Sequence, residues 1–215
     1  VLVVDRAEAA LVLAPEYDGR ASAIAYASVQ LLKATGIWAE VAEAQPIRDI
    51  RVSDGDSTMF LHYDHRRLGG APFGKMVENR HLRLAQARAA AAAGVETVVG
   101  AVAALETDAH SAQVTLEDGV RIRAPLVVGA DGARSAVRRM AGIGTRGWRY
   151  GQTGIVLTVR HKLPHGGVAH ERFLPAGPFA ILPLVGNRSS LVWTERADLA
   201  PAILELNKTR FQEEL

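Results

Sequence analysis

Cysteine is absent from the 215-residue sequence. Its absence excludes disulfide bonds, thiolate metal sites, iron–sulfur clusters and a cysteine nucleophile. Net charge is small as well, because 25 Lys and Arg residues face 23 Asp and Glu residues, which is not typical of a nucleic-acid-binding protein. The sequence also lacks an apolar run long enough to span a membrane, a leader-like start and the G-x-S-x-G motif of many hydrolases. We therefore expect a globular cytoplasmic protein that does not bind nucleic acid.

The first half of the sequence alternates between strand-like and helix-like segments. Residues 1–5 form an apolar, β-branched run that is typical of a central parallel strand. Helical spacing predicts helices over residues 21–35 and 73–93, each followed by a glycine. Short strands are predicted between residues 38 and 64, with a hairpin turn at Asp54–Gly55. This alternation favours a parallel α/β layer.

The second half is dominated by strand-like segments. Three of them occupy residues 95–106, 111–117 and 120–130, and a short helix is predicted over residues 133–142. More strands follow after about Gly144, before a helical stretch that closes the sequence. The expected fold class is α/β, with an incomplete Rossmann-like nucleotide-binding layer and an antiparallel β-sheet domain.

Two charged residues follow the first strand. Asp5 ends this strand, where an acid in dinucleotide-binding folds accepts hydrogen bonds from ribose hydroxyls, although a surface acid at a strand end is a common alternative. The planar guanidinium of Arg20 can pair with a diphosphate, although Asp18–Gly19 is also typical of an ordinary turn. The G-x-G-x-x-G turn expected about twenty residues before such an acid is missing.

The string LVVGADGARSAVRR, residues 126–139, is the most informative motif. An apolar strand leads through Gly129 and Gly132 into a helix that Ser135 opens. Glycines let a backbone approach a ligand closely. Asp131 would lie at the end of the strand, where its carboxylate can bind ribose hydroxyls.

The string Gly-Ala-Asp-Gly-x-x-Ser-x-Val-Arg at residues 129–138 resembles the internal fingerprint of the single-component flavin-dependent aromatic hydroxylases, which include p-hydroxybenzoate hydroxylase. Three further stretches resemble the ubiquinone-biosynthesis hydroxylases, which place oxygen on polyprenylated phenol rings. These stretches are DGRASAIAYASVQLLKATGIW (18–38), VENRHLR (77–83) and ERFLPAGPFAILPLVGNRSSLVWTE (171–195). The last stretch is the most specific, because it is long and lies outside the nucleotide-binding core. The resemblance extends over essentially the whole chain.

The resemblance implies FAD as the cofactor. Asp5 would hold its adenosine ribose, and Arg20 would contact its diphosphate or ribityl region. Asp131 and Gly132 would line the diphosphate, in a motif that also serves the nicotinamide donor in this family.

The resemblance also implies contacts nearer the flavin ring. Arg83 would contact the flavin, with Asn79 and Arg80 as rivals for that role. The sheet of residues 151–194 would form the floor on which a phenol docks. The family does not require a side-chain base, so no catalytic residue is assigned.

The implied reaction is hydroxylation of a phenolic ring, that of a polyprenylated ubiquinone precursor, with NAD(P)H and O₂. The resemblance implies an FAD-binding domain at residues 1–45 and 71–144, without the first β–α unit and the C-terminal flavin segment. A substrate-binding β-sheet region would occupy residues 46–70 and 145–215. Such a substrate is compatible with peripheral contact at the inner membrane, with a homo-oligomer and with a biosynthetic complex.

The sequence departs from the family's pattern at both ends, where two flavin-binding segments are missing, so it resembles an internal fragment. The alternative function is a non-catalytic piece of this fold that binds a partner and no flavin. The histidines, including His62 and His65, follow no ligand spacing of a regular helix, so no metal is expected. Phe173, Phe179 and Trp193 are candidates for a ring-binding pocket, although core packing is the commoner role.

Overall fold

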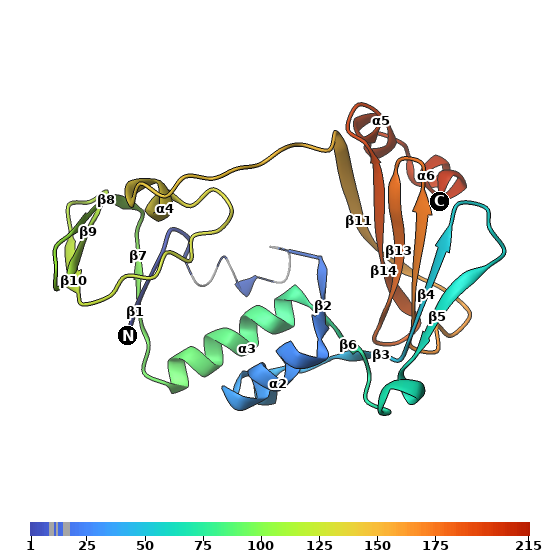
Figure 1. The fold of residues 1–215 in the computed structure, drawn as a ribbon, viewed down its shortest axis with the longest axis horizontal. Helices are drawn as coiled ribbons and strands as arrows, with labels where there is room; N and C mark the ends of the chain where they lie inside the picture. The colour runs from blue at the N-terminus through green and yellow to red at the C-terminus, as the bar shows by residue number, and fades with distance from the viewer. Residues whose placement is uncertain (9–10, 12, 15–17) are drawn as a thin grey trace. The chain divides into compact units, whose positions relative to one another are not determined.

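The computed structural model describes residues 1–8, 11, 13–14 and 18–215, and the chain divides into two compact units (Figure 1). Unit 1 comprises residues 1–12 and 90–148, and unit 2 comprises residues 13–89 and 149–215. These bounds are not those of the expected FAD-binding and substrate-binding regions, whose division stays a prediction. None of the described helices is long and apolar enough to cross a membrane.

The described residues of unit 1 include two small sheets and a short helix. Its elements are β1 (Leu2–Asp5), β7 (Glu96–Val99), β8 (Val102–Thr107), β9 (Ala112–Leu116), β10 (Arg121–Ala124) and α4 (Ala136–Met140). Strands β1 and β7 pair in parallel, as the apolar run at residues 1–5 predicts. Strands β8, β9 and β10 form an antiparallel sheet in the order β10-β9-β8.

The predicted strand over residues 120–130 is too long. Strand β10 ends at Ala124, and residues 125–130 are not part of any strand. Leu126 and Val128 are each 76% exposed. A strand requires a neighbouring strand to satisfy its backbone N–H and C=O groups, and within the described ranges no strand pairs with residues 125–130. The apolar sequence alone therefore does not make this segment a strand.

Unit 2 contains a three-stranded sheet, a six-stranded sheet and most of the helices. Its strands are β2 (Ala21–Ala25), β3 (Gln45–Ile47), β4 (Asp49–Asp54), β5 (Phe60–Asp64), β6 (Gly74–Glu78), β11 (Gln152–Arg160), β12 (Val168–Leu174), β13 (Gly177–Leu184) and β14 (Arg188–Arg196). Its α-helices are α2 (Tyr26–Ala34), α5 (Ala200–Leu204), α6 (Lys208–Glu214) and most of α3 (Asn79–Ala92), and its 3₁₀ helices are η1 (Ile37–Glu40) and η2 (His65–Leu68).

Both long helices predicted in the first half begin later than expected. Residues 21–25 form β2 before α2, and residues 74–78 form β6 before α3. The two short strands pair with each other, with Ala21 opposite Glu78 and Ala25 opposite Gly74. A Cβ at Gly74 would lie 2.4 Å from the carbonyl oxygen of Ile24, so the pairing requires glycine there. The tertiary pairing overrides the helical preference of both segments.

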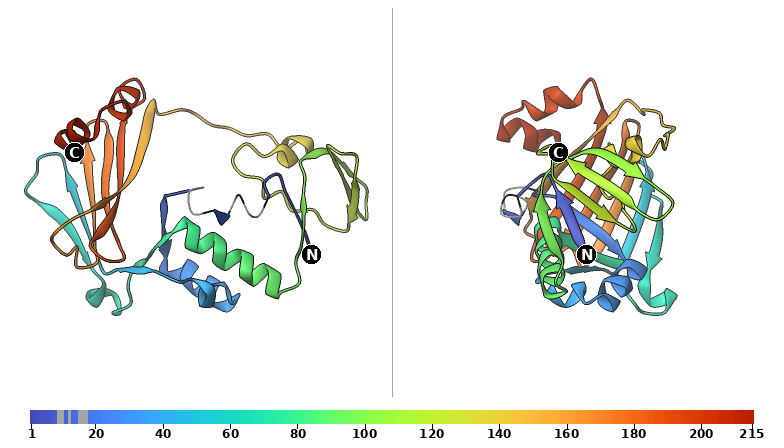
Figure 2. Two further views of the ribbon diagram at one scale, coloured as in Figure 1. Left: turned by 180° about the vertical axis from the view of Figure 1, so that it is seen from behind. Right: turned by 90° about the vertical axis from the view of Figure 1, so that its left-hand side faces the viewer.

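The six-stranded sheet has the strand order β11-β14-β13-β12-β4-β5. It is mixed rather than purely antiparallel, because β12 and β4 run in parallel. The turn predicted at Asp54–Gly55 joins β4 to β5, and Gly55 has a φ of +48°. Helices α5 and α6 follow the sheet in sequence and cover part of one side of it (Figure 2).

The two faces of this sheet have different surroundings. On the face that we call the helix-covered face, the ring of Trp193 lies 6.2 Å from that of Phe179 and 6.0 Å from that of Phe211 in α6. On the opposite face, Leu184 and Ala169 form the buried core of unit 2 with Ile47 of β3 and Met76 of β6. We call this second face the open face, because its rows beyond that core include exposed side chains.

Candidate functional site

Arg20 lies directly before β2 and is held by Asp18. Its Nε and Nη2 donate to the two carboxylate oxygens of Asp18, both at 2.9 Å, and the Arg20 backbone N–H donates to Asp18 Oδ1 at 2.9 Å. This paired geometry fixes the plane of the guanidinium, although the Arg20 side chain is 67% exposed. The Arg20 guanidinium beside Asp18 is also the main cause that holds the pKa of that carboxyl well below its usual range.

The start of α3 joins the same group. Asn79 Nδ2 donates to Asp18 Oδ2 at 2.9 Å, and Arg83 Nη1 lies 3.4 Å from the same oxygen. The Asn79 backbone N–H donates to the Arg20 carbonyl at 3.0 Å. We call Asp18, Arg20, Asn79 and Arg83 the Asp18 cluster. Two guanidiniums share this carboxylate, and the planar guanidinium is the cationic group best suited to pair with a phosphate.

The three residues considered for the flavin contact on α3 have different partners in the structure, and the contact itself stays a prediction. Arg83 and Asn79 both belong to the Asp18 cluster. Arg80 forms an ion pair with Glu78 instead, at 3.0 Å. Sequence reasoning assigned Asp18 to a turn and missed its role in joining Arg20 to α3. The Asp-x-Arg spacing of residues 18 and 20 was the available signal, because it allows a two-point pair between neighbouring side chains.

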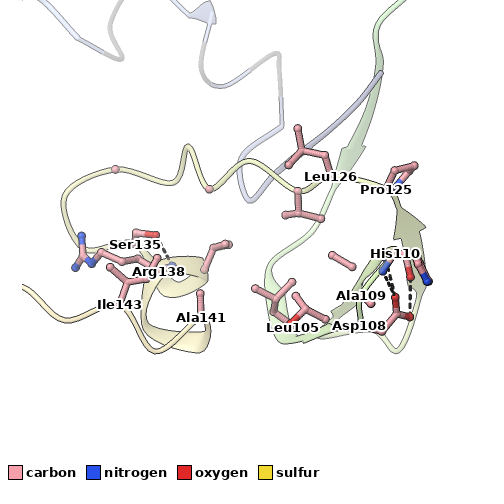
Figure 3. A pocket seen from close by; sticks show the side chains of 17 residues that line it. Leu105, Asp108, Ala109, His110, Pro125, Leu126, Ser135, Arg138, Ala141 and Ile143 are labelled. Carbon is pink, nitrogen blue, oxygen red and sulfur yellow. Dashed lines mark hydrogen bonds between the residues drawn. The ribbon is translucent and has the colours of Figure 1, made fainter.

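Asp131 in unit 1 has its carboxylate on the N-terminus of α4. The carboxylate accepts hydrogen bonds from the Ser135 hydroxyl, from the Ala136 N–H at 2.6 Å and from the Val137 N–H at 3.2 Å. Ser135 in turn accepts the Arg138 N–H at 2.9 Å, as the predicted helix start requires (Figure 3). These contacts, with the Ser135 hydroxyl first, lower the pKa of Asp131 to about 2. Contact of this carboxylate with a ribose stays a prediction.

The local structure explains why glycine occupies the two positions near Asp131. A Cβ at Gly129 would lie 3.0 Å from a methyl carbon of Val137, so glycine lets the loop pack against α4. Gly132 has a φ of +84°, which side chains rarely adopt. A cavity of about 650 Å³ adjoins this loop (Figure 3). Residues that line it include Leu105, His110, Leu126, Gly132, Ser135 and Arg138.

Asp131 also provides a test of how this loop is stabilised. Because its pKa falls from 3.8 to about 2 on folding, the charged carboxylate stabilises the fold above about pH 4 and this contribution disappears as the pH falls towards 2. We expect Asp131→Asn to melt below the wild type at pH 7 and level with it near pH 2. Thermal unfolding followed by circular dichroism across this range measures the difference. A difference in melting temperature between the two proteins that stays the same at every pH would contradict the capping role.

Asp5 lies where the sequence places it, at the carboxyl end of β1 and opposite Val99 of β7. Its Oδ1 accepts the Ala7 N–H at 3.0 Å, and its backbone carbonyl accepts the Gly100 N–H at 2.7 Å. The side chain is exposed. Ligands of open α/β sheets bind beyond this edge, so the position suits the predicted ribose contact.

Asp49, Asp64 and His65 have ligand atoms within 4.8 Å of one another, a grouping that the sequence spacing did not predict. Both carboxylates already have cationic or histidine partners. Asp64 forms an ion pair with Arg66 at 2.8 Å, and the carboxylate of Asp49 lies 2.8 Å from Nε2 of His62, within hydrogen-bond distance. These pairs account for the grouping without a metal ion.

The three aromatic candidates for a ring-binding pocket separate onto different faces. Phe179 and Trp193, both half-buried, pack against each other on the helix-covered face. Phe173 pairs with Pro178 and Asp54 on the open face and is 49% exposed. Only Phe173 of the three is therefore placed to contact a ligand on that face.

Comparison with known proteins places this site in a family. The family model described as "FAD binding domain" matches residues 1–202. Ubiquinone hydroxylase UbiL of Rhodospirillum rubrum is 53% identical over all of this chain and 51% of its own length. 3-Demethoxyubiquinol 3-hydroxylase of Escherichia coli is 36% identical over all of this chain and 56% of its own length. The chain thus spans about half the length of these relatives.

Solved structures share the fold. PqsL, a probable FAD-dependent monooxygenase of Pseudomonas aeruginosa, aligns with a TM-score of 0.76 at 22% identity over 94% of this chain and 56% of its own. HpxO of Klebsiella pneumoniae, solved with FAD and uric acid, aligns with a TM-score of 0.66 at 16% identity over 90% of this chain and 55% of its own. The expected fold class and the resemblance in the sequence are both confirmed. The chain therefore belongs to the family described as "FAD binding domain", whose model covers most of its length.

Proposed function

We propose that this chain holds FAD and takes part in the hydroxylation of a phenolic ring, that of a polyprenylated ubiquinone precursor, with NAD(P)H and O₂. The Asp18 cluster is the observation that carries the proposal, since it fixes two arginines in a geometry suited to a diphosphate. The ubiquinone hydroxylases among the relatives support the choice of substrate.

The residues of the cluster fit the charge of FAD. Arg20 uses Nε and Nη2 on Asp18, which leaves Nη1 for a second acceptor such as a phosphate oxygen. Arg83 extends the positive charge along α3 from the same carboxylate. Because Asp18 already holds both side chains, little conformational entropy remains to be lost when an anion binds.

The resemblance in the sequence is the support for two further proposed contacts with FAD, at Asp5 and at the loop of Asp131. Asp5 offers its carboxylate to the ribose hydroxyls at the edge of β1. Asp131 holds the loop of residues 129–132 against α4, and we propose that this loop lines the diphosphate through the backbone at Gly132. FAD, when bound, supplies the oxygen-activating redox chemistry, for which side chains have no equivalent.

The remaining parts of the proposal concern where the substrate binds, where in the cell the protein acts and how it assembles. The open face of the six-stranded sheet offers the floor for the phenol, with residues 46–70 and 145–215 as the substrate region. A polyprenyl tail favours a position at the cytoplasmic side of the inner membrane, through peripheral contact alone. Assembly as a homo-oligomer or within a biosynthetic complex fits the same substrate.

Isotope incorporation tests the proposed reaction. The FAD-loaded protein, given NADPH or NADH, ¹⁸O₂ and 2-prenylphenol, is expected to yield a ring-hydroxylated product that contains one ¹⁸O atom, measured by mass spectrometry. A parallel reaction without FAD serves as the control. Oxidation of the nicotinamide with unchanged phenol would contradict hydroxylation of this class of substrate.

A further inference from the structure

One row of side chains on the open face of the six-stranded sheet contains a single charge. The row crosses all six strands in register, and each residue pairs with the next. Its members, from β11 to β5, are Val156, Val192, Ala180, Glu171, Val52 and Leu61. Neighbouring strands are about 4.8 Å apart, so the Glu171 side chain is flanked on both sides by apolar neighbours.

Glu171 is partly buried and, among the described residues, has no hydrogen-bond or ion-pair partner. Asp49 is held by His62, and Glu78 is held by Arg188 at 2.7 Å. Within the part of the chain that the structure describes, no hydrogen bond or ion pair reaches the Glu171 carboxylate. The residue is partly buried, and burial raises the pKa of its carboxyl above the ordinary value. Its charged form is therefore destabilised, and no partner among the described residues compensates for this.

The open face is linked to the Asp18 cluster through the core of unit 2. Arg188 lies on the open face and pairs with Glu78, the last residue of β6, and the next residue along the chain is Asn79 of the cluster. On β13, Ala180 lies opposite Glu171 and Leu184 lies opposite Arg188, and these two positions are about 13 Å apart. Leu184 belongs to the buried core, so Glu171 lies beyond that core from Arg188.

An exposed ring lies beside the carboxylate on this surface. Phe173 is two residues along β12 from Glu171, so both side chains point to the same face. Phe173 is 49% exposed, in contrast to the packed rings of Phe179 and Trp193. An apolar floor, an aromatic edge and a partly buried acceptor match the chemistry of a phenol, whose ring is apolar and whose hydroxyl is a donor. Asp54, opposite Phe173 on the same face, is an exposed acid rather than a partly buried one.

We propose that Glu171 binds the substrate, accepting a hydrogen bond from the phenol hydroxyl while Val52, Ala180 and Phe173 contact the ring. This inference rests on the proposed function, because it requires a phenolic substrate. The hydrogen bond to a carboxylate increases electron density on the phenol oxygen and in the ring. It also fixes which ring carbon is presented to the cofactor. Glu171 is then both an orienting and a specificity-determining residue.

A pair of probes isolates the hydrogen bond. 2-Prenylphenol can donate to Glu171, whereas its methyl ether has no hydroxyl proton. Calorimetric titration of the FAD-loaded protein is expected to show that the wild type prefers the phenol by about tenfold or more, since a hydrogen bond to a charged group is worth about 1.5–3 kcal/mol. We expect Glu171→Gln to reduce this preference to a few-fold and Glu171→Ala to abolish it.

Glu195→Gln is the matched control. Glu195 also lies on a strand of the six-stranded sheet, opposite Thr153 and on the helix-covered face, and it accepts the Arg196 N–H at 2.7 Å. This variant is expected to keep the wild-type preference. Glu171→Gln preserves the shape of the side chain and removes an unpartnered charge, so we expect it to fold at least as stably as the wild type.

The outcomes separate this inference from the proposed function. If the wild type prefers the phenol and Glu171→Ala prefers it equally, phenol binding stands and the role of Glu171 is wrong. If the wild type binds neither probe, the phenolic substrate is wrong and the inference fails with it. A preference that depends on Glu171 and not on Glu195 supports both.

Discussion

Arg20→Ala is expected to weaken FAD binding by about 100-fold, because a phosphate contact from a fixed guanidinium is among the strongest single hydrogen-bonding interactions at such a site. Arg20→Lys keeps the charge but loses the planar fork, so we expect a loss of about tenfold. Titration of each variant with FAD, followed by flavin fluorescence, gives the affinities.

Arg196→Ala is the control for this experiment. Arg196 forms the same two-point pair with a carboxylate two residues away, Asp198, and its side chain is 63% exposed against 67% for Arg20. The two arginines therefore differ in location rather than in local geometry. Equal losses of FAD affinity in both variants would mean that the effect is one of general charge, and the assignment of Arg20 would fail.

Leu184→Ala is expected to lower the free energy of unfolding by about 2–5 kcal/mol, the range for a large-to-small substitution in a closed core. Leu184 is 2% exposed and packs with Ile47, Met76 and Ala169. This core joins the six-stranded sheet to β3 and β6, and β6 leads directly to Asn79. A looser core therefore also disturbs the Asp18 cluster.

Urea unfolding of Leu184→Ala and Leu163→Ala tests whether Leu184 belongs to the core of unit 2. Leu163→Ala is the comparison, because Leu163 is 80% exposed and belongs to the same unit. Its substitution is expected to change the free energy of unfolding by no more than about 0.5 kcal/mol. Similar losses in the two variants would show that Leu184 is not part of the core that holds the unit together.

The sequence predicted most of the strands, and its errors share one physical cause. Residues 21–25 and 74–78 have helix-compatible composition, yet they pair with each other across about fifty residues. Residues 125–130 have the apolar pattern of a strand but no described strand beside them. Local patterns describe what a segment can do, whereas pairing partners far away in the sequence decide what it does.

The resemblance proposes Arg20, Arg83 and the loop at Asp131 as FAD contacts, and these roles stay predictions. The structure joins the first two residues through Asp18. The role of Asp131 as a helix cap was hidden, because the same Asp-Gly string suits a ligand-binding loop and a helix start. The sequence does not single out Glu171, because alternation along a strand shows that side chains face opposite ways but not which face is covered.

Titration of the wild-type chain with FAD is the most direct test, since every role proposed above depends on this cofactor. We expect a saturable change in flavin fluorescence that Arg20→Ala shifts to higher FAD concentration. A signal that rises in proportion to added FAD, with no difference between the wild type and Arg20→Ala, would contradict the account and favour a partner-binding module without flavin.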